Sequence, residues 1–217
     1  FLIFLDSDDY LLKKSLNWIN KLIDKNNKKD LLISNKFISI NMLKVFVYHK
    51  LLNKKNLKIK SINRFIRLLN NEKNTYGNIY NYIINRNFLV NNKIGFTANV
   101  SFGEDQEFVA KILSYCKNFF FFNKPFYCYC SGAGNLSDSM SYNAGLSCLK
   151  VSNNLILLKE LKLLSKEKRL YIKRVINKLL KQFIARLICS PKKNIFKFSS
   201  YIKRNKKNFN FMKFKFL

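Results

Sequence analysis

The chain has 217 residues, of which 48% are hydrophobic and 15% aromatic, so it can bury a sizeable core and is not a disordered basic tail. Its 41 Lys and Arg residues against 12 Asp and Glu residues give a formal net charge of +29. No apolar run reaches the roughly 18–20 residues of a membrane-spanning helix. The 5 cysteines lack paired CxxC spacing, which favours reduced cytosolic thiols over disulfides or zinc, and the single His49 argues against histidine-based triads.

The chain begins with a short apolar run, Phe1–Leu5, that ends in the acidic sequence Asp6-Ser7-Asp8-Asp9. Such a run predicts a strand buried on both faces of a parallel sheet. A helix is expected next, with Asp8 or Asp9 as its N-cap. Its apolar residues recur at helical spacing: Leu12, Leu16, Ile19 and Ile23. This order places three carboxylates at the carboxyl end of a strand, where open α/β sheets bind ligands.

Further strands and a short helix are expected in the middle of the chain. Leu31–Ile40 and Tyr76–Ile84 are rich in β-branched and aromatic residues, which favour strands. Between them, Ser61 is a candidate N-cap for a helix that extends through Leu69. Asn118–Cys130 is a third strand-like segment, and the clearest loop of the chain follows it at 131–139.

A second informative stretch begins at Gly103. A helix is expected from about Glu104, because one apolar stripe recurs at helical spacing. The stripe consists of Phe108, Val109, Ile112, Leu113 and Cys116. Asp105 lies four residues before Val109 and eight before Leu113, so it is expected to point from the first turn toward the buried side.

The residues after 141 are expected to be helical and basic. From Lys168 to Leu217 there are 16 Lys and Arg residues and no Asp or Glu. A basic amphipathic helix can bind anionic lipid, at about 1 kcal/mol per Lys or Arg near the surface. The alternative is a helical bundle that packs on the preceding domain with a solvated lysine-rich face. Phenylalanines alternate with lysines near the C-terminus, but no nucleic-acid module accompanies them, so nucleic-acid binding is not favoured.

Both acidic motifs allow more than one interpretation. Asp6, Asp8 and Asp9 would repel one another, and a hard divalent cation such as Mg²⁺ or Mn²⁺ between them would relieve this repulsion. The alternative is that these acids begin a helix, where the positive end of the helix dipole stabilises them. Asp105, next to Glu104, could be a general base if a substrate hydroxyl came within about 3 Å. Its alternative is again an acid favoured by the helix dipole.

Four stretches occur in chain order: FLIFLDSDDY, YGNIYNYIINRNFLVNNKIGF, FGEDQEFVAKIL and NFFFFNKPFYCYCSGAGNLSDSMS. In this order and spacing they resemble the catalytic domain of family 2 glycosyltransferases, which have the GT-A fold. The resemblance is nearest to bacterial enzymes that build capsular, lipopolysaccharide O-chain or similar surface glycans. It implies an α/β fold, Rossmann-like, with a mostly parallel sheet and flanking helices, followed by a basic α-helical region.

The resemblance also implies roles for individual residues. Asp6 and Asp8 match the D-x-D motif, which contacts the donor ribose and a Mg²⁺ or Mn²⁺ ion that bridges the diphosphate. Asp105 matches the base that deprotonates the acceptor hydroxyl, and Glu104 would shape the acceptor side. Ile79 and Tyr80 occupy the region where family members commonly carry a Trp.

The expected organisation is a partial catalytic domain over 1–141 and a basic helical extension over 142–217. Nothing corresponds to the N-terminal nucleotide-binding half of the family, so we expect a fragment that lacks on the order of 60 residues or more and is inactive alone. The intact enzyme would transfer a sugar from a nucleotide-sugar donor to a glycan or lipid-linked acceptor with inversion. It would work in the cytoplasm at the inner face of the membrane, held there by its basic helices.

Two alternatives remain. The first is a haloacid-dehalogenase-like phosphatase, which also places D-x-D after an apolar strand. In that class a Thr or Val normally follows two residues after the second Asp, where this chain has Tyr10. The second is a truncated, inactive remnant that adheres to membranes.

Overall fold

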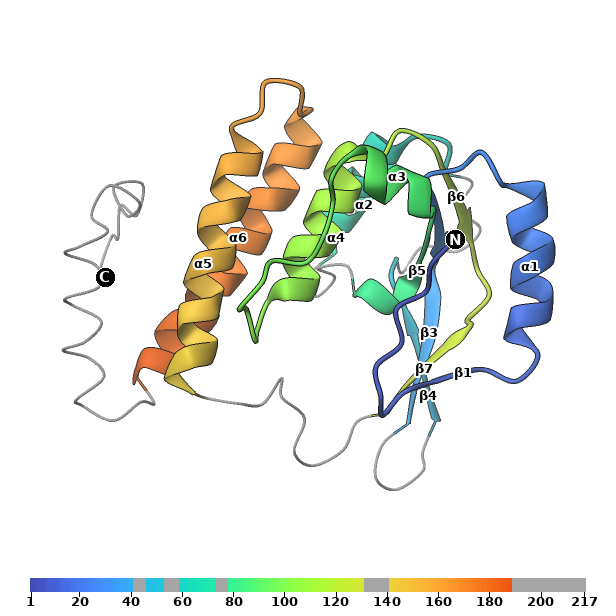
Figure 1. Cartoon of the computed structure of the whole chain (residues 1–217), viewed down its shortest axis with the longest axis horizontal. Coiled ribbons are helices and arrows are strands. Elements are labelled where there is room, and N and C mark those ends of the chain that lie inside the picture. The colour runs from blue at the N-terminus through green and yellow to red at the C-terminus, as the bar shows by residue number, and fades with distance from the viewer. Residues whose placement is uncertain (41–45, 53–58, 73–77, 131–140, 189–217) are drawn as a thin grey trace.

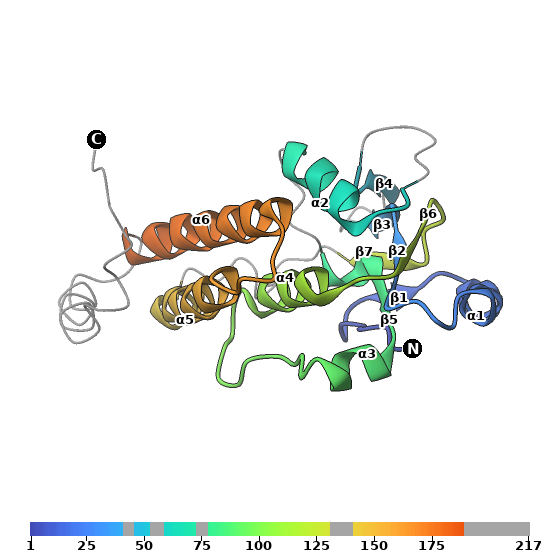
Figure 2. The same ribbon diagram turned by 90° about the horizontal axis from the view of Figure 1, so that it is seen from above.

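The computed structural model describes residues 1–40, 46–52, 59–72, 78–130 and 141–188. The expected loop at 131–139 and the basic residues after 188 lie outside this described part. The fold is α/β: two sheets lie between α1 on one side and the long helices α2, α4, α5 and α6 on the other (Figures 1 and 2). The elements in chain order are β1 (Tyr10–Leu11), α1 (Ser15–Lys25), β2 (Leu31–Ser34), β3 (Lys36–Ile40), β4 (Phe46–Lys50), α2 (Ile62–Asn71), the 3₁₀ helix η1 (Ile79–Asn81), β5 (Tyr82–Ile84), α3 (Arg86–Asn91), α4 (Glu104–Tyr115), β6 (Phe119–Phe122), β7 (Tyr127–Cys130), α5 (Tyr142–Lys159) and α6 (Lys166–Ile188).

The two sheets have the strand orders β1-β7-β3-β4 and β5-β2-β6. The pairs β2–β6 and β3–β7 are parallel, whereas β1–β7, β2–β5 and β3–β4 are antiparallel. The sheets are therefore mixed rather than mostly parallel. The short antiparallel strands at their edges account for the difference, since they pair without a crossover helix.

Strand β2 lies at the centre of the core and is buried on both faces. Leu31 and Ile33 face the cluster formed with α2, α4, α5 and α6, whereas Leu32 faces the cluster formed with α1. All three side chains are 0% exposed. Successive side chains of a strand point to opposite faces, so this one strand joins the two apolar clusters.

The prediction of a buried strand at the N-terminus was wrong. Residues 1–5 make a single antiparallel bridge, between Leu2 and Ile84 beside the edge strand β5. Leu5 is 49% exposed. The segment has a neighbour on one side among the described residues, so its apolar run is only half covered.

The expected N-caps were correct for one helix and wrong for another. Ser61 is the N-cap of α2, in an extended conformation, although its side chain makes no capping hydrogen bond. Helix α1 begins at Ser15, after Lys14 in the left-handed conformation (φ 62°), and not at Asp8 or Asp9. The short strand β1 separates the acidic turn from this helix.

The C-terminal helices were predicted correctly as helical. Helices α5 and α6 form an antiparallel hairpin beside α4, and α6 also packs on α2 (Figures 1 and 2). Val151 on α5 and Val175 and Leu179 on α6 are fully buried in the larger core cluster. Within the described residues, no helix is long and apolar enough to cross a membrane.

Candidate active site

The acidic turn is anchored by Asp9, which is 9% exposed. Tyr127 on β7 donates its hydroxyl to Asp9 Oδ2 at 2.5 Å, and the backbone N–H of Cys130 donates to Oδ1 at 2.7 Å. The N–H of Asp6 donates to the same Tyr127 oxygen at 3.3 Å. With both carboxylate oxygens bonded to β7, Asp9 holds the turn in place and leaves Asp6 and Asp8 exposed.

The start of α4 depends on Gly103. This residue has φ +84°, a conformation that side chains with a Cβ rarely adopt, and its position is covered by Leu179 and Val151. The three acids of the first turn, Glu104, Asp105 and Glu107, suit the positive end of the helix dipole.

Three phenylalanine rings connect the acidic turn to α4. Phe4, which lies just before the turn, packs edge to face on Phe108 of α4 with ring centroids 5.2 Å apart. Phe96 stacks on Phe108 at 4.4 Å and contacts Phe4 at 5.3 Å. Because Phe4 lies two residues before Asp6 and Phe108 lies three residues after Asp105, their contact holds the two acidic motifs near each other.

The structure brings Asp6 and Asp105 close enough to influence each other. The pKa of Asp105 is raised from 3.8 to about 7, chiefly by burial and then by the charges of Glu104 and Asp6. Asp6 is exposed, but the partial burial of its carboxyl, followed by the charges of Asp9 and Asp8, also raises its pKa. A carboxyl group with a pKa near 7 can exchange a proton at neutral pH.

Tyr80 borders the same group of acids. Burial chiefly raises the pKa of its phenol, and the charges of Tyr129, Asp9, Asp105 and Asp6 add to the effect. Its ring stacks on Tyr127 with centroids 5.1 Å apart. Tyr80 therefore supplies an aromatic wall beside the acids, at the position where the resemblance leads one to expect Trp.

Glu104 is partly buried, and its Oε2 has no hydrogen-bond partner in the described part of the chain. An acceptor oxygen of this kind is available to a ligand hydroxyl or amide. Of the expected site residues, Asp6 interacts electrostatically with Asp105 and with Asp8, and Asp105 also interacts with Glu104; Asp8 lies exposed in the turn.

Asp6 and Asp8 are compatible with a divalent cation. No group of three or more His, Cys, Asp or Glu side chains within the described residues is arranged to hold a metal ion by itself. Mg²⁺ is usually held by one or two carboxylates together with substrate phosphates, so two carboxylates are a sufficient protein contribution. The repulsion that raises the pKa of Asp6 is also what a cation would relieve. The donor set therefore fits Mg²⁺ or Mn²⁺.

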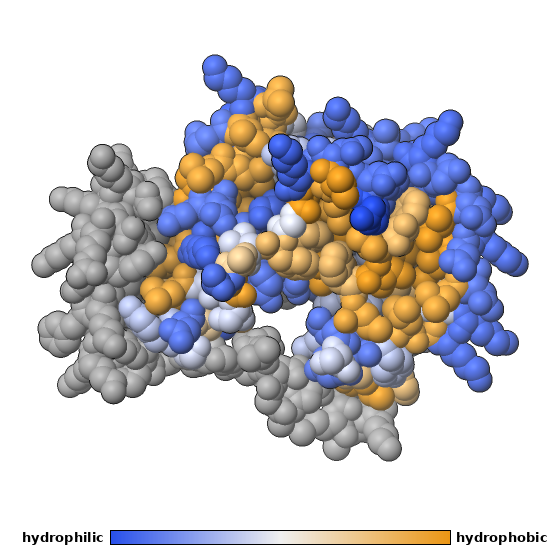
Figure 3. Space-filling model, viewed as in Figure 1, coloured by the Kyte–Doolittle hydropathy of each residue, from blue (hydrophilic) through white to orange (hydrophobic). Residues whose placement is uncertain are grey.

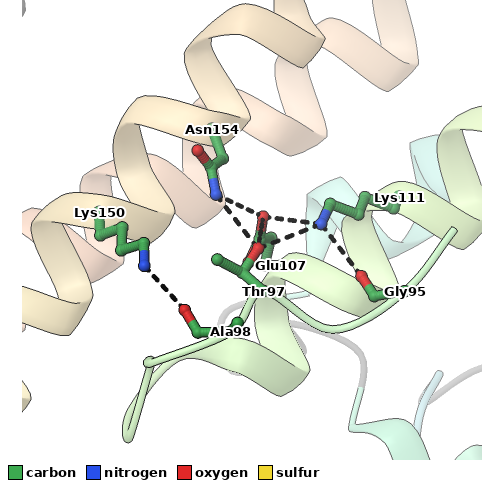
Figure 4. Close-up of polar contacts among 7 residues, drawn as sticks. All are labelled: Gly95, Thr97, Ala98, Glu107, Lys111, Lys150 and Asn154. Carbon is green, nitrogen blue, oxygen red and sulfur yellow. Dashed lines mark hydrogen bonds and ion pairs between the residues drawn. The ribbon is translucent and has the colours of Figure 1, made fainter.

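A polar network that the sequence did not reveal supports the segment before α4 (Figure 4). Glu107 is 1% exposed; its Oε1 accepts from Thr97 at 2.9 Å and from Asn154 at 3.0 Å, and pairs with Lys111 at 2.8 Å. Lys111 also donates to the backbone oxygen of Gly95 at 3.2 Å. Only the i, i+4 spacing of Glu107 and Lys111 was visible in the sequence. The network fixes residues 95–98 against α4 and α5.

Comparisons with known proteins agree with the fold. A crystal structure of the S. aureus glycosyltransferase TarS, residues 1–349 in complex with UDP-GlcNAc, matches with a TM-score of 0.53 and 19% identity, over 83% of this chain and 47% of that chain. The same TarS segment with UDP matches with a TM-score of 0.47 and 18% identity, over 89% and 48%.

This chain therefore spans about half the length of those TarS chains. No protein-family model matches it, and no curated protein does. The fold of this chain is accordingly similar to that of a glycosyltransferase domain, with C-terminal helices present.

Proposed function

We propose that the protein takes part in glycosyl transfer from a nucleotide-sugar donor to a glycan acceptor, with inversion at the anomeric carbon. One observation carries the proposal: Asp105, at the start of α4, has a pKa near 7 because it is buried beside Glu104 and Asp6. The resemblance of the D-x-D and E-D sequences to family 2 glycosyltransferases supports the same roles. The fold similarity to TarS, whose crystal structure holds UDP-GlcNAc, supports a nucleotide-sugar donor.

In this mechanism Asp105 acts as the general base. Its carboxylate accepts the proton of an acceptor hydroxyl while that oxygen attacks the anomeric carbon from the face opposite the diphosphate. The bond between the anomeric carbon and the diphosphate oxygen breaks, and the electron pair leaves with the nucleoside diphosphate. Burial favours this role, because it keeps the pKa of Asp105 close to the pH at which the reaction runs.

The other acids hold the substrates. Asp6 and Asp8 would bind Mg²⁺ or Mn²⁺, and Asp6 would contact the donor ribose. When bound, the cation supplies positive charge that offsets the charge of the departing diphosphate. Glu104, whose Oε2 has no hydrogen-bond partner among the described residues, would orient the acceptor on the α4 side.

The acceptor is proposed to be lipid-linked, within the synthesis of capsular or similar surface polysaccharide at the cytoplasmic face of the membrane. Lys166, Lys173 and Lys181 lie exposed along α6, and hydrophobic side chains gather at the α5–α6 connection, where Leu163 is 97% exposed (Figure 3). Basic residues beside exposed apolar side chains are suited to an anionic lipid surface.

Co-sedimentation with vesicles tests the membrane contact. The protein should bind phosphatidylglycerol vesicles and not phosphatidylcholine vesicles, and Leu163→Glu should weaken this binding. Leu16→Glu, at a 53% exposed position on α1, is the matched control. Equal effects of the two variants would contradict a contact at the α5–α6 connection.

Donor binding and transfer are tested separately. In the complete protein, UDP-GlcNAc binding should require Mg²⁺ or Mn²⁺, and Asp8→Ala should remove the metal-dependent part of that binding. Asp105→Asn should bind the donor almost as well as the unchanged protein but transfer sugar about 10²–10⁴-fold more slowly. Loss of donor binding with Asp105→Asn would contradict the base assignment.

A phosphoester substrate tests the rival enzyme class. Phosphatase activity that survives Asp105→Asn but disappears in Asp6→Asn would overturn the proposal in favour of a phosphatase with an Asp nucleophile. Absence of both donor binding and phosphatase activity would favour an inactive remnant.

A further inference from the structure

A pocket of about 420 Å³ lies between the segment that precedes α4 and the N-terminal half of α5. It is lined by Asn99, Val100, Ser101, Asn143, Leu146, Ser147 and Lys150. Small-molecule sites typically enclose about 300–1,000 Å³, so this volume suits a small ligand, such as one or a few sugar units. None of the acids described above contributes to this lining.

The lining combines hydrogen-bonding groups with one positive charge. Among the lining residues, Asn99 and Asn143 carry amides and Lys150 carries an ammonium group. Ser101 and Ser147 carry hydroxyls, whose oxygens lie 3.3 Å apart and can share a hydrogen bond. The Lys150 ammonium donates to the backbone oxygen of Ala98 at 2.7 Å. An ammonium group has three donors, so this bond orients Lys150 and still leaves capacity for an anionic ligand. The two hydroxyls and two amides suit a ligand that carries several hydroxyl groups.

Hydrogen bonds hold the two walls of the pocket together before any ligand binds. The N–H of Ser101 donates to Ser147 Oγ at 3.1 Å, which joins the connecting segment to α5. Asn154 of α5 also donates to Thr97 at 3.2 Å, within the network of Glu107 (Figure 4). A site that is already ordered loses less entropy when it binds.

The pocket adjoins the proposed base along the chain. Ser101 lies two residues before Gly103 and four before Asp105, and Val151, next to Lys150, lies against Gly103. A ligand in the pocket would therefore lie beside the N-terminus of α4. Lys150 would attract an anion there, whereas no acidic side chain among the described residues lines the pocket.

We propose that this pocket binds the acceptor of the transfer reaction, and that the acceptor segment held there is a polyol or sugar that carries one anionic group, a phosphate or a carboxylate. The assignment of the ligand as acceptor rests on the function proposed above. The recognition chemistry itself, hydroxyl groups together with one anion, rests on the lining alone. Lys150 is then a residue that determines specificity.

Titration of the isotopically labelled protein by NMR tests the pocket directly. Three probes differ in their charged group: glycerol 3-phosphate, glycerate and glycerol. We expect both anionic probes to shift the amide resonances of residues 99–101 and 143–150. The probe with the lower Kd then shows whether the pocket prefers a phosphate or a carboxylate. Equal, weak shifts with all three probes, or shifts elsewhere, would overturn the proposal.

Substitutions of Lys150 test whether its positive charge binds the anionic probe. Lys150→Gln should raise the Kd of the tighter anionic probe about tenfold, as expected for the loss of one charge-assisted hydrogen bond. Lys150→Arg should retain most of the affinity, and Lys162→Gln, at an exposed position in the α5–α6 connection, should leave it unchanged. An unchanged Kd in Lys150→Gln would contradict the proposed role of this residue.

Failure of the pocket and failure of the proposed function give different results. If the protein binds UDP-GlcNAc but neither anionic probe, the acceptor pocket is wrong and the transferase proposal stands. If it binds an anionic probe through Lys150 but no nucleotide sugar, the pocket stands as an anionic polyol site and its assignment to an acceptor is wrong.

Discussion

Gly103 and Leu179 are packed so closely that a Cβ on Gly103 would lie 2.7 Å from Leu179 Cδ2. Such a separation is far below van der Waals contact. Gly103 also has φ +84°, so both the space and the backbone conformation exclude a larger residue. The packing of α6 thereby determines where α4 begins and how Asp105 is presented.

Gly103→Ala should consequently destabilise the protein by about 1–3 kcal/mol, from backbone strain and from displacement of Leu179. Chemical denaturation monitored by circular dichroism measures the change. Gly95→Ala is the matched control, since nothing lies within 4 Å of its Cβ position and its φ is not in the left-handed region. Equal stability of the two variants would contradict this role of Gly103.

In the complete protein, Asp105→Asn should lower the rate of transfer by about 10²–10⁴-fold, which is the usual contribution of a general base. The amide has nearly the same size as the carboxyl group and cannot accept the proton. Initial rates with a saturating nucleotide sugar measure the effect, and Asp24→Asn on α1 provides a control. A rate within threefold of the unchanged protein would exclude Asp105 as the base.

Transfer should also depend on pH through Asp105. The reaction requires the ionised carboxylate, so kcat/KM should fall about tenfold per pH unit below the pKa of about 7 and level off above it. A profile that is flat between pH 5 and 8, with an unchanged fold, would contradict the raised pKa.

The stability of the protein should change in the opposite sense over the same range. The folded state keeps the proton of Asp105 up to about pH 7, whereas the unfolded chain releases it near 3.8, so the folded state binds more protons between these values. The free energy of unfolding should therefore fall as the pH rises from about 4 to 7, by at most about 4 kcal/mol from this group. Asp105→Asn should remove that part of the decline. The difference between the two proteins in thermal unfolding at pH 5 and pH 8 tests the sign.

Tyr127→Phe should destabilise the protein by about 1–3 kcal/mol, because the buried carboxylate of Asp9 loses its hydroxyl donor. The acidic turn would also be held less firmly, so the KM for the donor should rise. Tyr48→Phe removes a hydroxyl from a 70% exposed side chain and should have no effect. If Tyr127→Phe altered neither stability nor KM, Asp9 would not be the anchor of the turn.

Glu107→Gln should destabilise the protein by about 2 kcal/mol, since its Oε1 serves Thr97, Asn154 and Lys111 in a buried site. Glu160→Gln disrupts an exposed ion pair with Lys159 at 3.4 Å and should cost less than about 0.5 kcal/mol. Urea denaturation of both variants gives the comparison. Similar losses of unfolding free energy in the two variants would contradict a stabilising role for the hydrogen bonds of Glu107.

The sequence predicted the helix that begins just before Asp105, because its start depends on local signals that are visible within about ten residues. The apolar run that ends in Asp6 was equally visible, but the buried strand that it predicted is absent. The proximity of the two acidic motifs in space was not visible, because it depends on Phe4 and Phe108, which are far apart in the chain. The roles assigned to Asp6, Asp8 and Glu104 stay predictions.

Predictions from local sequence were wrong where two segments have the same pattern but different tertiary contacts. Phe1–Leu5 and Leu31–Ser34 are both short apolar runs, and only the second lies between two neighbouring strands. Asp9 satisfied the rule for an N-cap, but Tyr127, which lies 118 residues later, binds its carboxylate. Such choices are made by tertiary contacts, which propensity and periodicity do not contain.

The packing of α6 on α2 and α4 has a consequence for synthesis on the ribosome. The apolar faces of α2 and α4 are covered by Tyr171, Val175 and Leu179, which are translated about 60–110 residues later. Until α6 has emerged, a nascent chain would expose Phe65 and Leu113 to solvent, in the state most prone to aggregation and most in need of chaperones. The α/β part and the helical hairpin should therefore reach their final structure together, only after α6 has been translated.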